Sequence, residues 1–283
     1  MRLPCDRATF CRPSKLCHGL ALPYNEGDYT RTIKMPQDRS IEIRQLTQHQ
    51  EFADAVRLQQ EIWGFQDVEL LPLRLFIVAD KIGGQVLGAF KRTRMIAFSL
   101  CIPGLKPGNK FYLHSHMLGV LPEFRNAGVG RSLKLKQREY ALGRGIDLIE
   151  WTFDPLEIKN AFFNIERLGA IVRRYVHNQY GTTTSHLHGG LPTDRLVAEW
   201  WIQSPRAEAF CNHHAFQRPI AEAIISVPTQ ITELREGNPE RARDIQRCLS
   251  EQFDRHFQAE LAVIGFEKTD QAGSYLLGQW ESK

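Results

Sequence analysis

Hydrophobic and polar residues begin to alternate regularly at residue 41. The segment IEIRQL, residues 41–46, has the two-residue period of a strand. Residues 49–64 then repeat apolar side chains at helical spacing and end at a glycine, and residues 73–81 predict a second helix. The first structured part of the chain is therefore predicted to be a strand followed by two helices.

Strands dominate the centre of the chain. Short apolar stretches predict them at residues 85–90, 95–102, 111–120, 146–154 and 170–176. A basic, helix-like segment separates the third of these strands from the fourth. Another helix, with Pro155 at its start and Gly169 past its end, separates the fourth from the fifth. This order predicts antiparallel hairpins first and then a crossover helix that makes two strands parallel. The expected fold class is mixed α/β, with a mostly antiparallel sheet and helices on both faces.

The pattern is weaker beyond residue 181. DRLVAEWWI predicts a closing strand, residues 238–261 predict a long helix, and AVIGFEK and SYLLGQW predict a final pair of strands. The expected organisation is a disordered tail at 1–37, a domain at 38–190, and an extension at 191–283 that packs on or extends the same sheet. Met35 stands where order is expected to begin, so it is an alternative start of the protein.

Composition narrows the function classes. The chain has 283 residues, of which 42% are hydrophobic, and a net charge of +4, which suits an anionic ligand but is too mild to argue for nucleic acid. No apolar run approaches the roughly 18 residues of a membrane span. Six cysteines, none in a CxxC pair, indicate neither a disulfide framework nor a zinc site. A cytoplasmic location is expected.

The most informative segment is GVLPEFRNAGVGRSLKLKQRE, in which Gly128 and Gly130 separate an apolar strand from a basic helix. Glycine lets another molecule approach the main chain, and the amides at a helix start carry partial positive charge. The amides of residues 125–130 are therefore a candidate phosphate cradle, and Arg131 and Lys134 follow it where further anionic groups are expected. Walker and dinucleotide-binding glycine motifs are both absent.

The run RNAGVG, Arg125 to Gly130, resembles the acetyl-CoA-binding motif Q/R-x-x-G-x-G/A of the GNAT (Gcn5-related N-acetyltransferase) superfamily. More narrowly, the chain is similar to a subgroup of bacterial acyltransferases of that family with a C-terminal extension. The resemblance implies that the preceding strand splays from its parallel neighbour and that acetyl-CoA, or another acyl-CoA, lies in the gap. The binding residues expected there are Leu118, Val120, Arg125, Asn126, Ala127, Gly128, Val129, Gly130 and Arg131.

A second family landmark, A-x-x-x-Y-x-x-x-G-F, is matched only in part. NAFFNIERLGA has the alanine and the glycine, but Ile165 replaces the tyrosine that commonly protonates the leaving thiolate. Tyr175 on the next strand, or water, is the alternative acid. Asn160 and Asn164, four residues apart on one predicted helix face, are candidate contacts for the cofactor or the substrate, with a solvated surface as the other interpretation.

Acyl transfer to an amine also needs a base. His114 and His116 share one side of their strand by the two-residue period, and Glu150 lies on the neighbouring strand; His116 and Glu150 are the candidates favoured here. The histidines are alternatively plain hydrogen-bonding residues of the core. A His-x-His metal site lacks a third ligand with telling spacing, so no metal is expected.

Four functions fit these observations to different degrees. The first is acyl transfer to a small amine such as an amino acid, and the second is a non-catalytic acyl-CoA-binding module. Acetylation of protein lysines and nucleic-acid binding have less support. No membrane partner is expected. The acceptor, the acyl length and the oligomeric state, including a homodimer, are left open.

Overall fold

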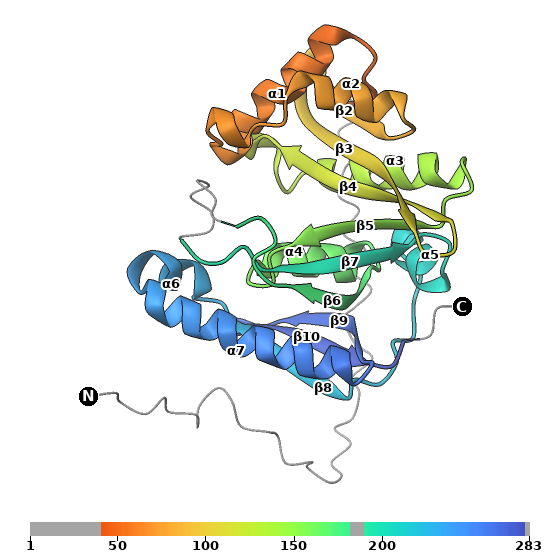
Figure 1. Cartoon of the computed structure of the whole chain (residues 1–283). Helices are drawn as coiled ribbons and strands as arrows, with labels where there is room; N and C mark the ends of the chain where they lie inside the picture. Colours follow the sequence, from red (N-terminus) through yellow and green to blue (C-terminus); the bar gives the residue numbers. More distant parts are fainter. Residues whose placement is uncertain (1–40, 182–189, 281–283) are drawn as a thin grey trace. The chain divides into compact units, whose positions relative to one another are not determined.

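The computed structural model describes residues 41–181 and 190–280, and their ten strands form one sheet (Figure 1). The strand order is β1-β2-β3-β4-β5-β7-β6-β9-β10-β8. The predicted tail at 1–37, with Met35, lies outside the described residues. The strands are β1 (Ile41–Gln45), β2 (Gln85–Lys91), β3 (Arg94–Lys106), β4 (Lys110–Val120), β5 (Leu148–Phe153), β6 (Ile171–Val176), β7 (Arg195–Trp201), β8 (Ala223–Pro228), β9 (Ala262–Lys268) and β10 (Ala272–Gly278).

The predicted mixed, mostly antiparallel sheet is confirmed. Each pair of neighbouring strands is antiparallel except β4 and β5, which run parallel. Parallel neighbours need a crossover connection, which the basic helix between them provides. β7 comes after β6 in the chain but lies between β5 and β6 in the sheet. The described residues, 41–181 and 190–280, fall in one compact unit, and the strands after residue 190 continue the sheet of the first part.

Helices cover the sheet on both faces. They are α1 (His49–Trp63), α2 (Leu73–Lys81), α3 (Val129–Leu142), α4 (Ile158–Phe162), α5 (Pro205–Asn212), α6 (Ile231–Gly237) and α7 (Pro239–Gln258), with short η1 (Asp67–Glu69), η2 (Pro122–Phe124) and η3 (Phe163–Arg167). None of these helices in the described ranges has the length and apolar character of a membrane span.

Two neighbouring residues of β4 show that α1 and α3 lie on opposite faces. A Cβ on Gly119 would meet the ring of Trp63 in α1, whereas the side chain of Leu118 lies 3.5 Å from the Cβ position of Gly130 in α3. Successive side chains of a strand point to opposite faces, so the two helices sandwich this part of the sheet.

Tertiary packing changes one of the predicted helices. The helix expected from Pro155 begins only at Ile158, because the Asp154 carboxylate accepts a hydrogen bond from the amide of Leu156 (2.8 Å) and forms a turn there. The helix then widens into the π-helical η3, a geometry that occurs often at functional sites. The sequence pattern missed α5, β8 and α6, which are short elements of eight, six and seven residues.

Candidate functional site

β4 and β5 diverge after a short parallel contact. Their register comprises Leu113 with Ile149 and His114 with Glu150. On the other side of β4, the pairing with β3 shifts so that His116 is the extra residue of a β-bulge. A bulge bends its strand and increases the local twist, so the remainder of β4 turns away from β5. The splayed strands implied by the family resemblance are thus a feature of this structure.

The main chain of β4 faces the resulting gap at two residues. The amide of Leu121 bonds to the carbonyl of Ile96 in β3 (3.0 Å), so Leu121 points toward β3. Backbone groups alternate in direction along a strand, which turns Val120 away from β3, and Leu118 with it. The Val120 carbonyl accepts a bond from Nε of Arg125 (3.2 Å). This edge of β4 can pair with an extended ligand as it would with another strand.

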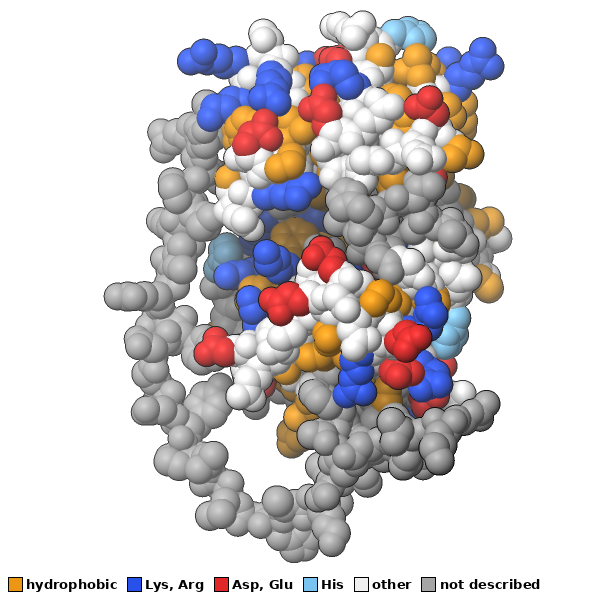
Figure 2. Space-filling model, turned by 90° about the vertical axis from the view of Figure 1, so that its left-hand side faces the viewer, with side chains coloured by type: hydrophobic (Ala, Val, Ile, Leu, Met, Phe, Trp, Pro, Cys, Tyr) orange, Lys and Arg blue, Asp and Glu red, His pale blue; other side chains and the backbone are white. Residues whose placement is uncertain are grey.

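A recess opens on this side of the molecule. In Figure 1, β4 and β5 separate toward the left-hand side of the view. Figure 2 looks at that side and shows a hollow near its centre, bordered by Lys and Arg side chains with hydrophobic surface inside it. An anionic molecule with an apolar portion fits such a surface.

The glycine turn forms the start of α3 next to the gap. Gly128 has φ +81° and Asn126 has φ +62°, both in the left-handed region, and a Cβ on Gly128 would point into open space. The first helical hydrogen bond runs from the amide of Ser132 to the carbonyl of Gly128 (3.0 Å). The amides of the first helical turn therefore have no partner within the helix, and Gly128 has no side chain that caps them. They form a main-chain site for an anion.

The basic side chains after the turn do not face this site. Arg131 donates to the carbonyls of Phe210 (3.3 Å) and Cys211 (2.8 Å) at the end of α5. Lys134 is buried, donates to Oγ of Ser115 (2.9 Å) and lies over the Trp151 ring at 3.5 Å. The expectation that Lys134 meets anionic groups is wrong, because it points into the core. Arg131 is engaged elsewhere, so its main-chain amide is the part near the cradle.

Lys134 belongs to a buried polar cluster that sequence reasoning missed. Burial lowers the pKa of its ammonium to about 7, and burial raises the pKa of the nearby Cys101 thiol to about 11. Oγ of Ser115 also bonds to Oε1 of Gln137 (3.2 Å). One signal was present: Lys134, Gln137 and Ala141 follow the three- and four-residue spacing of the buried face of α3.

The two strand histidines lie together beside the gap. The ring centroids of His114 and His116 are 5.8 Å apart. Burial lowers the pKa of both, that of His114 to about 4 with a further contribution from the His116 charge. Both imidazoles are therefore neutral near pH 7 and can accept a proton. His116 is the better candidate, because it lies in the bulge at which β4 turns away from β5, next to the gap.

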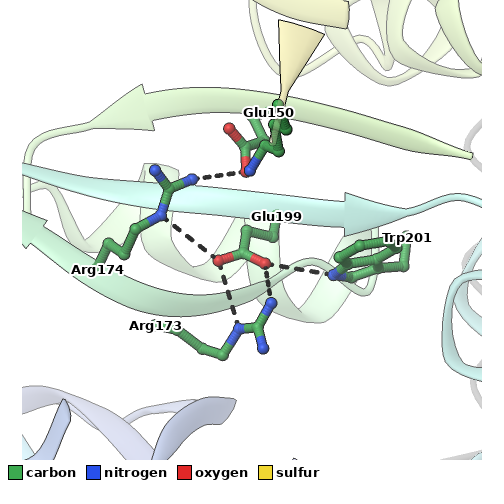
Figure 3. Close-up of polar contacts among 6 residues, drawn as sticks. Glu150, Arg173, Arg174, Glu199 and Trp201 are labelled. Atoms are coloured by element: carbon green, nitrogen blue, oxygen red, sulfur yellow. Dashed lines mark hydrogen bonds and ion pairs between the residues drawn. The ribbon is translucent and has the colours of Figure 1, made fainter. Parts of the chain in front are cut away.

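Glu150 lies directly beside His114 in the register but is already paired. It is buried, and its carboxylate contacts Nζ of Lys106 and Nη2 of Arg174 (2.6 Å) (Figure 3). The structure thus places the candidates His116 and Glu150 in one region. Glu150 as the base would have to act while it is paired with both Lys106 and Arg174.

Tyr175 is not part of this group. It lies on β6, separated from β4 by two strands, and its hydroxyl donates to Oδ2 of Asp194 (2.7 Å). Its ring packs on Phe253 of α7 with a centroid separation of 5.7 Å. Burial, and then the Asp194 carboxylate, raise the pKa of the hydroxyl well above its usual range. Its role as an acid stays a prediction.

The candidate residues on α4 and η3 differ in environment. Asn160 is exposed, whereas Asn164 is 4% exposed, so the two amides do not present one common surface. Ile165, in the position of the family tyrosine, is fully buried in the core. Contact of Asn160 or Asn164 with a cofactor stays a prediction. Within residues 41–181 and 190–280, no group of three His, Cys, Asp or Glu side chains is arranged to hold a metal ion.

Comparison with family models and with curated proteins gives no match. Among solved structures, the ribosomal-protein-S18-alanine N-acetyltransferase of Escherichia coli is 16% identical over 58% of this chain and 95% of its own (TM-score 0.47). A Desulfovibrio desulfuricans protein assigned to the GNAT family is 14% identical over 57% and 99% (TM-score 0.46). Salmonella typhimurium YncA, solved with its cofactor acetyl-CoA, is 14% identical over 60% and 99% (TM-score 0.47).

Proposed function

We propose that the chain is an acyl-CoA-dependent N-acyltransferase of the GNAT superfamily. It transfers an acetyl or larger acyl group to the amine of a small molecule such as an amino acid. One observation carries the proposal: β4 leaves β5 at the His116 bulge, so the main chain of Leu118 and Val120 faces a gap beside the uncapped start of α3. The gap and the helix start suit the two ends of one ligand, an extended amide chain and a diphosphate.

The chain's own residues fit such a cosubstrate. The edges of Leu118 and Val120 would pair with the pantetheine amides, and the amides from Val129 onward would hold the pyrophosphate. Acyl-CoA supplies an acyl thioester. The amide of Leu118 is the candidate donor to the thioester oxygen. An amine acceptor is mostly protonated at neutral pH, so a base must take one of its protons, and neutral His116 is suited to that step.

Calorimetric titration with coenzyme A tests the proposal. A Gly128→Val variant places a branched side chain at the cradle and is expected to weaken coenzyme A binding at least tenfold. Gly145→Val is the matched control, because Gly145 follows the other end of α3, has φ +70° and has equally open space at its Cβ position. Both changes carry the same kind of backbone strain, roughly 1–2 kcal/mol. Absence of coenzyme A binding by the unaltered protein, or equal affinities of the two variants, contradicts the proposal.

A non-catalytic acyl-CoA-binding module is the second candidate. The observation that favours it is the buried Ile165 in the position of the family tyrosine, together with the engagement of Tyr175 by Asp194. Coenzyme A release in the presence of a panel of amines and of acetyl and longer acyl donors separates the two functions. Tight binding without release on any amine supports the module and rejects the enzyme.

A further inference from the structure

A row of ionisable side chains crosses four strands next to the gap. His114 of β4 pairs with Glu150 of β5, and Glu150 pairs in turn with Glu199 of β7. The row ends on β6, where a bulge at Arg173 interrupts the pairing with β7. Consecutive strand residues normally point to opposite faces, but the bulge lets both Arg173 and Arg174 reach Glu199.

The contacts in this row form one connected network (Figure 3). Arg173 holds Glu199 through two nitrogens, Nη2 at 2.5 Å and Nε at 3.4 Å. Arg174 bridges the two carboxylates, with Nη2 2.6 Å from Glu150 and Nε 3.7 Å from Glu199. Lys106 also contacts Glu150, and the indole N–H of Trp201 donates to Glu199 (3.3 Å).

Exposure shows which charges a ligand would meet. The carboxylate side chains of Glu150 and Glu199 are 5% and 4% exposed, whereas Lys106, Arg173 and Arg174 are 30%, 38% and 49% exposed. The carboxylates are therefore the buried part of the network and the cations are its surface. Three cations against two carboxylates leave one positive charge. A cationic ligand finds no free carboxylate here, and a singly charged anion restores neutrality.

We propose that this network, named here the Arg174 floor (Lys106, Glu150, Arg173, Arg174 and Glu199), binds a carboxylate of the acceptor, so that the acceptor is an amine that also carries a carboxylate. The inference rests on the proposed function and specifies its acceptor. A single excess charge favours a monoanionic carboxylate over a dianionic phosphate.

The geometry limits the acceptor to a short molecule. Arg174 belongs to β6, but its guanidinium reaches Glu150 on β5, which is one strand from His114. Neighbouring strands are about 4.8 Å apart. A carboxylate on Arg174 therefore leaves the amine of the same molecule within a few ångströms of the histidines and the gap. Trp201 lies beside the cations and offers an apolar surface to the remainder of the molecule.

The test compares each L-α-amino acid with its own carboxamide as acceptor for acetyl-CoA, measuring coenzyme A release. The two members of a pair share the amine and the side chain and differ in the carboxylate. For the accepted pairs, kcat/KM is expected to be at least tenfold higher for the acid. The Arg174→Met variant is expected to have a KM for the acid that is about 10- to 100-fold higher, because it loses one hydrogen bond to a charged group. The KM for the amide should be nearly unchanged.

The Arg174→Met variant is expected to fold, because the ion pairs of Glu150 with Lys106 and of Glu199 with Arg173 remain. Arg57→Met is the matched control, because Arg57 is a 53% exposed, ion-paired arginine on α1. Its replacement should change neither the KM for the acid nor the KM for the amide. Equal use of acids and amides by the unaltered protein overturns the proposal, as does an equal loss of both in Arg174→Met, or a panel in which nothing binds.

Failure of this inference is distinguishable from failure of the proposed function. If coenzyme A binds but acids and amides react equally, the carboxylate site alone is wrong. If coenzyme A does not bind, the proposed function is wrong, and calorimetric titration of the free acids and amides then decides the carboxylate site by itself. Weaker binding of the acids to Arg174→Met supports the site in that case, and unchanged binding rejects it.

Discussion

The buried ammonium of Lys134 should make the stability of the protein depend on pH in a defined window. Burial lowers its pKa from 10.5 to about 7. Between these two values the unfolded chain binds the proton and the folded chain does not. Stability therefore rises with pH from about 7 to about 10.5, and it falls as pH drops toward 7. The lowering of the pKa from 10.5 to about 7 corresponds to an upper bound of about 5 kcal/mol over the whole window.

A Lys134→Met variant isolates this contribution, because methionine fills a similar volume without a titrating group. Between pH 7 and pH 8.5, the free energy of unfolding of the unaltered protein is expected to rise by about 1–2 kcal/mol relative to that of the variant. The window stops there because Cys101, whose pKa is raised from 9.0 to about 11, makes stability fall with increasing pH above about 9.

Urea unfolding at several pH values, followed by tryptophan fluorescence, measures the difference. Lys136→Met is the control, because Lys136 lies two residues further along α3, is 40% exposed and pairs with Glu139 (2.8 Å). Its pH dependence should match that of the unaltered protein. Parallel stability curves for Lys134→Met and the unaltered protein across pH 7–8.5 would show that Lys134 is not buried as described, and the reasoning would fail.

Two further predictions concern proton transfer. His116→Gln is expected to lower kcat by about 100-fold or more. Because burial lowers the pKa of His116, the acid limb of the kcat/KM profile of the unaltered protein should lie below pH 6.5. An acid limb above that pH contradicts the role of His116 as the base. Tyr175→Phe should leave kcat unchanged and lower stability by about 1–3 kcal/mol, because Asp194 loses its buried donor. Tyr180→Phe, at an exposed hydroxyl, is the stability control, and a large fall in kcat of Tyr175→Phe would identify Tyr175 as the acid.

Local chemistry made part of the site predictable from sequence. The period of residues 111–120 identified β4, and the glycines after it identified an uncapped helix start, because Gly128 tolerates its left-handed conformation without strain. The two-residue period also placed His114 and His116 on one side. These inferences depend on the chain within a few residues of each position, and for that reason they needed no knowledge of the fold.

Other features of the site depend on partners far away in the chain. Arg131 and Lys134 look alike in sequence, yet one binds carbonyls of α5 and the other lies over Trp151. The pairing of Glu150 with Arg174 depends on the position of β7 between β5 and β6 and on the β-bulge at Arg173. No local sequence pattern predicts the strand order or the bulge. The π-helical turn that places Asn160 and Asn164 in different environments is likewise a response to packing.

The sequence by itself determined the order of most elements, the parallel crossover and the anion-binding turn, because hydrophobic period and glycine conformation act over short distances along the chain. Tertiary structure alone decided which charges are buried and which remain exposed. The ion pair of Glu150 with Arg174, 24 positions apart, and the register pairing of Glu150 with Glu199, 49 positions apart, exist only once the strands are aligned. Alignment also sets the solvent exposure of each group, and with it the cost of leaving a charge unpaired.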